Sequence, residues 1–220
     1  MSAPHQSPAP FDLPIDLTAL DQWVLWTREN RDGRPTKVPY QANGKRAESN
    51  NAETWAPHHV VLNAWQEVPE RYAGIGFVFG PDDPFPGIDL DNCLDAHGEI
   101  KPWATPILDR FANTYTEISP SGRGVKIFLR ARLDTKGRAA KYEDGRIEIY
   151  DRRRFFTVTG RRLNGNPLEI EEHQANVPWL LGLISCDNGG AKTGQKKADL
   201  RKQKNVSEGE RYFYLQSFAA

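Results

Sequence analysis

The sequence predicts a mixed α+β fold, because short segments with a strand pattern alternate with segments that have a helical pattern. Residues 74–80 form an apolar and aromatic run bounded by glycines, which is typical of a buried strand. Residues 58–67 instead place Val61, Leu62 and Trp65 at helical spacing. An apolar fraction of 38% in 220 residues is enough for one well-packed domain.

In the first half of the chain, apolar runs predict strands at 22–27, 35–40, 74–80 and 88–91. Residues 28–34 are expected to form a polar turn and residues 43–51 a loop. Helices are expected at 58–67 and 101–112, the second with Trp103, Ile107, Leu108 and Phe111 on its apolar side.

In the second half, strands are expected at 115–119, 125–130, 146–150 and 155–159. The segment 125–130 alternates clearly, with Val125, Ile127 and Leu129 on one face and the residues between them on the other. Residues 132–141 are expected to be a basic loop, and residues 178–183 a closing helix.

Composition divides the chain into four parts. Residues 1–15 are rich in Pro, Ser and Ala and are expected to be a disordered leader before a folded domain at 16–183. Residues 184–205 are expected to be a flexible linker. Residues 206–220 regain apolar residues at helical spacing, and we expect them to begin a helical region of a longer protein.

Two classes of protein are disfavoured by the composition. No segment has the apolar length of a membrane span, and the N-terminus lacks a secretory signal. Cys93 and Cys186 are the two cysteines, so neither a disulfide framework nor a four-cysteine zinc site is expected. We expect a cytoplasmic protein without zinc.

A net charge of zero conceals a strong asymmetry along the chain. Residues 1–122 have a net charge of −8, and residues 123–162 have a net charge of +8. This basic block predicts an anionic partner, either nucleic acid or nucleoside triphosphates, although a solvated sheet face is the alternative.

The segment 87–91 places two carboxylates on one strand. Side chains alternate along a strand, so Asp89 and Asp91 project on the same side. The pair is either an exposed edge with two solvated acids or a site for a divalent cation. An EF-hand is excluded, because Cys93 and Leu94 stand where that loop needs a ligand and a glycine.

Two further segments extend this pattern. The glycine-rich turn at 120–124 precedes Lys126, and consecutive backbone N–H groups in such a turn can bind an anion. Glu148 lies between two isoleucines, repeating the arrangement around Asp89. Three carboxylates around a phosphate-binding turn favour metal-assisted phosphoryl transfer over an edge-strand glutamate paired with an arginine.

Taken together, the segments 87–91, 119–126 and 147–160 resemble, in order and spacing, the three motifs of archaeo-eukaryotic-type primases. They are most similar to the primase–polymerase domains of phage and plasmid replication proteins, over residues 18–183. The resemblance implies a mixed α/β domain with an RRM-like catalytic sheet and an N-terminal α/β part.

The resemblance also implies roles for individual residues. Asp89, Asp91 and Glu148 would hold two divalent ions, either Mg²⁺ or Mn²⁺. The residues that would bind the incoming triphosphate are Ser119, Ser121, Gly122, Arg123, Gly124 and Lys126. Lys126 departs from the family, which commonly has histidine there, but a lysine can still neutralise a phosphate. Glu148 stands where the family often has aspartate.

The resulting hypothesis is a template-directed nucleotidyltransferase that makes primers and extends them as a DNA polymerase. Its expected partners are single-stranded template DNA, nucleoside triphosphates and a C-terminal helicase-type region, during phage or mobile-element replication in a bacterial host. The candidate contacts to template phosphates are Lys37, Arg130, Arg132, Arg138, Arg153 and Arg154. Two alternatives stay open: a non-catalytic nucleotide- or nucleic-acid-binding module, and a metal-dependent nuclease.

Overall fold

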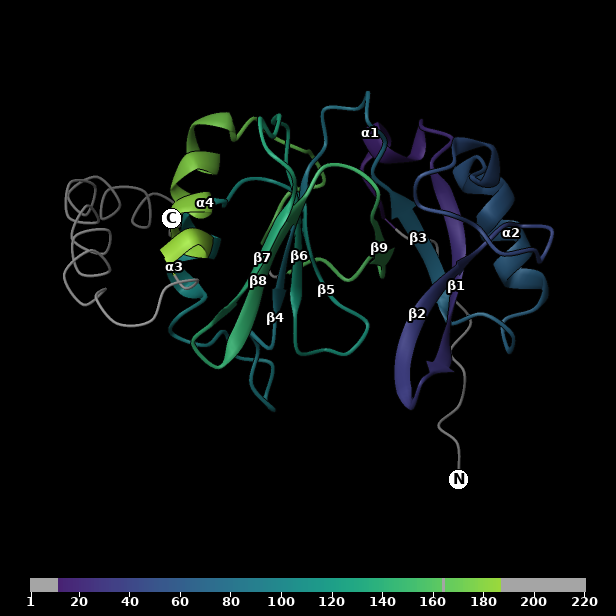
Figure 1. The fold of residues 1–220 in the computed structure, drawn as a ribbon, viewed down its shortest axis with the longest axis horizontal. Coiled ribbons are helices and arrows are strands. Elements are labelled where there is room, and N and C mark those ends of the chain that lie inside the picture. Colours follow the sequence, from purple (N-terminus) through teal and green to yellow (C-terminus); the bar gives the residue numbers. More distant parts are fainter. Residues whose placement is uncertain (1–11, 164, 187–220) are drawn as a thin grey trace, which may run out of the picture. The chain divides into compact units, whose positions relative to one another are not determined.

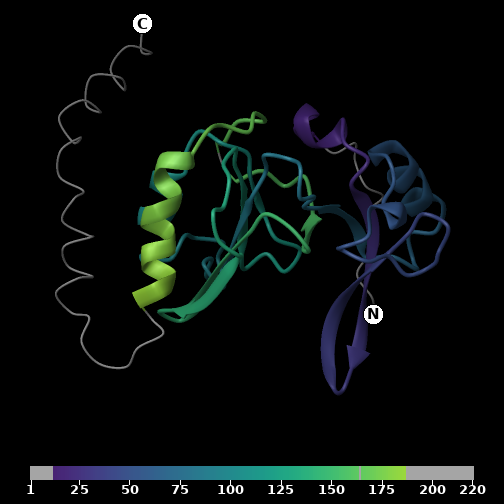
Figure 2. The same cartoon turned by 45° about the horizontal axis from the view of Figure 1, so that its top comes forward.

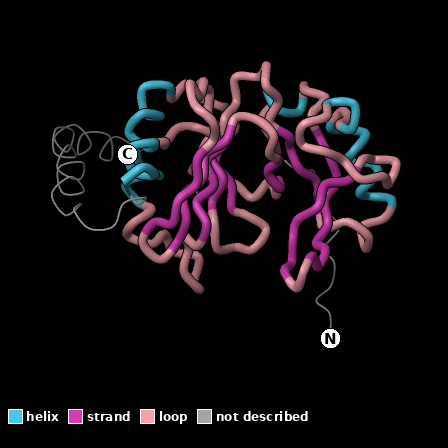
Figure 3. Tube along the Cα trace, viewed as in Figure 1, coloured by secondary structure: helices cyan, strands magenta, loops and turns pink. Residues whose placement is uncertain are grey.

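The described residues, 12–163 and 165–186, form two antiparallel sheets with helices in a computed structural model (Figures 1 and 3). One sheet has the strand order β2-β1-β3-β9 and the other the order β5-β6-β4-β8-β7. The predicted mixed α+β class is confirmed. Both sheets belong to one compact unit that extends to Ser185.

The four-stranded sheet is made of β1 (Trp23–Arg31), β2 (Arg34–Tyr40), β3 (Gly74–Val78) and β9 (Phe155–Val158). Asp32 and Gly33 both have positive φ between β1 and β2, as two-residue hairpin turns require. The predicted polar turn at 28–34 is therefore wrong: β1 and β2 continue through most of it, with register pairs from Leu25↔Tyr40 to Arg31↔Arg34.

Short helices accompany this sheet. They are α1 (Ile15–Thr18), the 3₁₀ helix η1 (Ala52–Thr54) and α2 (His58–Glu67), which matches the predicted bounds of 58–67. The buried Val61 of α2 packs in one apolar cluster with Trp23, Leu25 and Ile75 of the sheet.

The five-stranded sheet has β4 (Gly87–Asp91) at its centre, between β6 (Val125–Phe128) and β8 (Gly145–Tyr150). The outer strands are β5 (Thr116–Ile118) and β7 (Arg138–Tyr142). Figures 1 and 2 show α3 (Thr105–Arg110) and α4 (Val177–Cys186) on one side of this sheet. A second 3₁₀ helix, η2 (Gln174–Asn176), leads into α4.

Strand β7 corrects the expected loop at 132–141. Exposed Arg138 and Lys141 hide the strand in the sequence, while Ala140 and Tyr142 are buried. Charged residues are common on edge strands, because they discourage pairing with another chain.

The predicted helix bounds also change. The helix expected at 101–112 shortens to Thr105–Arg110, with Pro106 in its first turn, where proline is favoured. The closing helix runs beyond 183 to Cys186. The rest of the expected linker, the C-terminal helix and residues 1–11 of the leader lie outside the described residues, and none of the described helices has the length and apolar character of a membrane span.

Aromatic rings pack the remaining face of the five-stranded sheet against the other sheet. The ring of Phe128 lies 6.0 Å from Phe79, 6.3 Å from Phe77 and 5.6 Å from Phe156. A Cβ atom on Gly87 would lie 2.4 Å from the rings of Phe79 and Phe156. The first residue of the segment 87–91 is therefore glycine because two aromatic rings occupy the space of a side chain.

Candidate active site

The central strand β4 carries the two predicted aspartates on the face that packs toward the aromatic cluster. In register, Asp89 lies opposite Lys126 of β6 on one side and Glu148 of β8 on the other. Cross-strand partners project from the same face of a sheet. The structure thus brings three residues from three separate motifs into one row, with Asp91 two residues further along the same face.

Lys126 is an integral part of this row. Its Nζ forms an ion pair with Asp89 Oδ2, and its side chain is 2% exposed. The ammonium also lies 4.1 Å from the ring centre of Phe156, within the range of a cation–π interaction. The other oxygen, Asp89 Oδ1, is buried and has no hydrogen-bond partner, which is costly for a carboxylate.

Asp91 and Glu148 have different surroundings. Desolvation, followed by the nearby charge of Asp89, raises the pKa of Asp91, and Lys126 opposes the shift. Asp91 remains exposed, so solvent screens part of this effect. Glu148 forms an ion pair with Arg146, which lies opposite Asp91 in register.

The site fits a divalent cation in part. Among the residues that the structure describes, no three His, Cys, Asp or Glu side chains are grouped to hold a metal ion. Two of the carboxylates instead have basic partners, since Lys126 pairs with Asp89 and Arg146 pairs with Glu148. The unpartnered Asp89 Oδ1 and the exposed Asp91 still offer the oxygen ligands that a hard cation prefers.

The turn at 119–124 lies next to the aspartates. A Cβ atom on Gly124 would lie 2.9 Å from the carbonyl oxygen of Leu90. Ser119 Oγ accepts a hydrogen bond from Gly124 N at 3.2 Å, and Gly122 N donates to Ser119 O at 2.9 Å. These N–H groups already have acceptors, so the exposed side chains of Ser121 and Arg123 are the groups available to a ligand.

Lys37 reaches the same site from the four-stranded sheet. Desolvation and then the charge of Lys126 lower its pKa, while Asp89 and Asp91 act in the opposite direction. Its Nζ lies 6.0 Å from the ring centre of Trp26. The side chain remains exposed, so its charge is available to an anionic ligand.

The predicted arginine contacts are dispersed. Arg130 pairs with Asp16 at 2.8 Å and stacks over Phe85 at 4.9 Å, which indicates a packing role. Arg138 donates a hydrogen bond to Ser185 Oγ at 2.5 Å. Arg132 is exposed, and its backbone N–H donates to Gln174.

Arg153 and Arg154 instead line an open depression of about 650 Å³. Lys136 and Arg152 add to its positive charge, and Asp134 is its one acidic lining residue. Tyr150, also in the lining, lies two residues beyond Glu148 and projects from the same face of β8. The depression, which we call the basic depression, therefore adjoins the carboxylates.

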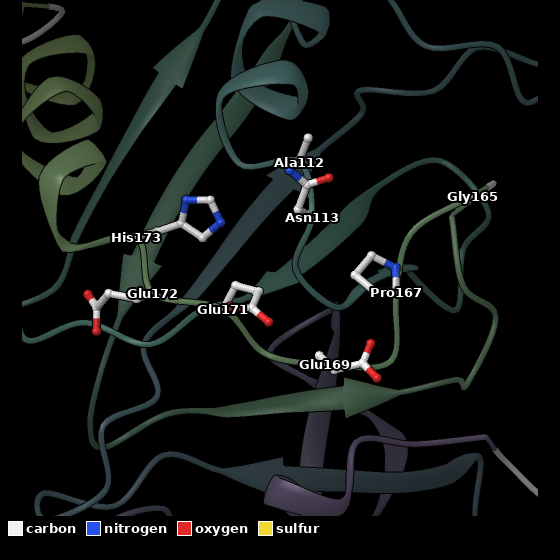
Figure 4. Close-up of a pocket in the computed structure, with 8 residues that line it drawn as sticks. All are labelled: Ala112, Asn113, Gly165, Pro167, Glu169, Glu171, Glu172 and His173. Atoms are coloured by element: carbon white, nitrogen blue, oxygen red, sulfur yellow. The ribbon is translucent and has the colours of Figure 1, made fainter. Parts of the chain in front are cut away.

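A second pocket, of about 590 Å³, has the opposite charge (Figure 4). It is lined by Glu169, Glu171, Glu172 and His173 together with residues of the loops near Asn113 and Pro167. None of the predicted site residues lines it.

A comparison with curated proteins identifies a relative of this chain. The DNA Primase-polymerase of Nitratiruptor phage NrS-1 is 37% identical over 167 residues, which is 73% of this chain. The predicted resemblance to primase–polymerases is confirmed. The chain spans about 22% of that primase–polymerase's length. No family model matches the chain.

One residue of this site was missed by sequence reasoning. Glu117 of β5 lies opposite Lys126 in register and is fully buried. Burial raises its pKa to about 7, and hydrogen bonds from Tyr115, Gly160 and Thr159 oppose the shift. Its position inside a short strand, between Thr116 and Ile118, was the available signal, but its partner follows only from the pairing of β5 with β6.

Proposed function

We propose that this chain is a template-directed nucleotidyltransferase, a DNA primase-polymerase that synthesises primers from nucleoside triphosphates. One observation carries the proposal: Asp89 and Asp91 project from one face of the central strand, with Lys126 and Glu148 directly beside Asp89. The named function of the phage relative supports the same class of enzyme.

Asp89, Asp91 and Glu148 are the proposed ligands of Mg²⁺ or Mn²⁺. When bound, two such ions would activate the primer 3′-hydroxyl and stabilise charge on the leaving pyrophosphate. The chain itself holds these carboxylates on one rigid sheet face. An all-oxygen ligand set suits Mg²⁺ or Mn²⁺ better than zinc.

The proposed triphosphate site lies between the turn at 119–124 and Lys37. Ser121 and Arg123 present exposed side chains from the turn, and Arg123 is oriented by a 2.8 Å hydrogen bond to Asn92 Oδ1. Lys37 adds a positive charge from the other sheet. These groups would orient the triphosphate beside Asp91 and offset its negative charge.

The template is proposed to enter along the basic depression. One of its lining residues, Tyr150, projects from the face of β8 that also carries Glu148, so a bound strand would lead toward the carboxylates. We further propose a helicase-type region of the full-length protein as a partner, in the cytoplasm of a bacterial host. This context rests on the resemblance and on the phage source of the relative.

A primer-synthesis assay tests the proposal. Purified protein is incubated with Mg²⁺ or Mn²⁺, single-stranded template and labelled nucleotides, with ribo- and deoxyribonucleotides supplied separately. We expect labelled products, and a loss of at least about a hundredfold when Asp89→Ala and Asp91→Ala are combined. Glu99→Gln, at an exposed glutamate, is the matched control. No product, or product that survives the double substitution, would contradict the proposal.

A second candidate function is a nucleotide-binding module without chemistry of its own. The observation that favours it is the pairing of Asp89 with Lys126 and of Glu148 with Arg146, which occupies two of the three proposed ligands. Calorimetric titration with a triphosphate and Mn²⁺ distinguishes the two: binding without turnover supports the module. Loss of input DNA without added nucleotides would instead indicate a nuclease.

A further inference from the structure

Two charged residues of the described chain are almost completely buried, and they face each other. Glu117 is fully buried and Lys126 is 2% exposed. They are register partners on β5 and β6, so both side chains project from the same face. Burying two ionisable groups is expensive unless they are paired, so this arrangement requires an explanation.

Glu117 is held firmly in place. Its Oε2 accepts hydrogen bonds from the Tyr115 hydroxyl at 2.9 Å and from Gly160 N at 3.0 Å. Thr159 N lies 3.1 Å from Oε1 and 3.2 Å from Oε2. Backbone N–H groups can only donate, so these contacts favour the ionised carboxylate. At a pH above its raised pKa of about 7, Glu117 thus presents a fixed negative charge beside Lys126.

Lys126 stands between two carboxylates. Asp89 lies opposite it on β4, and Glu117 lies opposite it on β5. The ammonium contacts Asp89 in this structure, while register partners have Cβ atoms only about 5 Å apart. A flexible lysine side chain can therefore reach either carboxylate by changing rotamers, without any movement of the sheet.

We propose that Glu117 is a positioning residue that receives Lys126 when a divalent cation binds to Asp89. The inference rests on the proposed function, because it concerns the same cation site. The cation repels the ammonium, and a buried ammonium without a partner would be costly. Glu117 provides that partner within the protein, so both oxygens of Asp89 become available as ligands.

The charge pattern explains how a lysine can occupy this position. If Lys126 could pair only with Asp89, its ammonium would compete with the metal ion for the same carboxylate oxygen. With Glu117 on its other side, Lys126 remains paired in both states. Lys37 and Asp91 also act on the site, but they lie at its exposed edge and not between the two carboxylates.

Mn²⁺ binding without nucleotide tests this proposal. Titration followed by electron paramagnetic resonance gives the affinity at about pH 8, where Glu117 is ionised. We expect Glu117→Gln to weaken binding roughly tenfold, because Lys126 then remains on Asp89. Glu99→Gln should leave the affinity unchanged.

A double substitution separates this role from mere support of the fold. In the Lys126→Met background there is no ammonium to receive, so adding Glu117→Gln should change the affinity by less than about threefold. An equal loss in both backgrounds, or no loss in either, would overturn the proposal. Absence of Mn²⁺ binding in the unsubstituted protein would instead count against the proposed metal-dependent function itself.

A second measurement needs no substitution at Glu117. The ¹⁵Nζ resonance of Lys126, assigned with Lys126→Met, should shift when Mg²⁺ is added, because the ammonium changes its carboxylate partner. Lys101, which pairs with Asp144 at 2.7 Å, should not shift. An unchanged Lys126 resonance at saturating Mg²⁺ would overturn the proposal.

Discussion

At the scale of single residues, the site depends on charges that are buried in pairs. Lys126 is enclosed by Asp89, Glu117 and the ring of Phe156, so its charge is compensated from several sides. Beside this lysine, the buried Asp89 Oδ1 has no hydrogen-bond partner. Such incompletely satisfied groups are commonly found where a ligand completes the arrangement.

Glu117 should make the stability of the protein depend on pH. Its pKa is 4.5 when unfolded and about 7 when folded, so the folded state binds the proton more tightly. Stability from this group is fully present below pH 4.5 and is lost as the pH rises through about 7. The loss should be on the order of 3 kcal/mol. Glu117→Gln should flatten this part of the profile in urea denaturation, and an unchanged slope would contradict the prediction.

Gly87 should tolerate no side chain. The new methyl group of Gly87→Ala would meet Phe79 and Phe156 at 2.4 Å, and overpacking of this kind costs about 1–3 kcal/mol. Gly182→Ala is the control, since nothing lies within 4 Å of the position that its new methyl group would take and α4 is helical there. That change should stabilise by up to about 1 kcal/mol. Thermal unfolding of both variants checks the prediction, which fails if Gly87→Ala melts at the original temperature.

At the scale of elements, the sequence predicts those helices and strands that have a clear local residue pattern. Strand patterns predicted β4, β6, β8 and β9, and helical spacing predicted α2 with its correct bounds. Strand β7 was missed because its exposed arginine and lysine resemble a loop. The hairpin at Asp32 and Gly33 was missed because the charged residues around it concealed a turn signal of two residues.

The candidate site, like the fold, could be predicted from the sequence only in part. The shared face of Asp89 and Asp91 follows from alternation within one strand, so the sequence was sufficient to predict it. The position of Glu148 beside Asp89, and of Glu117 beside Lys126, depends on the register between strands that are distant in sequence. A register has no local signature in a single sequence, and the ion pair of Arg146 with Glu148 could not be predicted for the same reason.

At the scale of the whole molecule, the basic block at 123–162 does not act as one surface. Arg130 and Arg138 are engaged in packing and hydrogen bonding, whereas Arg153 and Arg154 line the basic depression. Only part of the +8 charge of this block therefore lies in the basic depression.

Arg153 and Arg154 should contribute to the salt dependence of DNA binding. Each phosphate contact to a single strand adds about 0.7 to the slope of log affinity against log salt concentration. Replacing both arginines with glutamine should therefore reduce the slope by about 1.4. Fluorescence anisotropy with a labelled oligonucleotide measures the slope, and Lys101→Gln is the control, because Lys101 is paired with Asp144. An unchanged slope would exclude the basic depression as the path of the strand.

The pairing of β9 with β3 has a consequence for how the chain folds. Residues 155–158 follow all five strands of the other sheet in sequence, yet they complete the sheet that begins at Trp23. During synthesis on a ribosome, the edge of β3 that pairs with β9 therefore stays open until the whole five-stranded sheet has been synthesised. Pairing over such a long separation closes a large loop, which slows folding. The two sheets are consequently expected to reach their native state together and not one after the other.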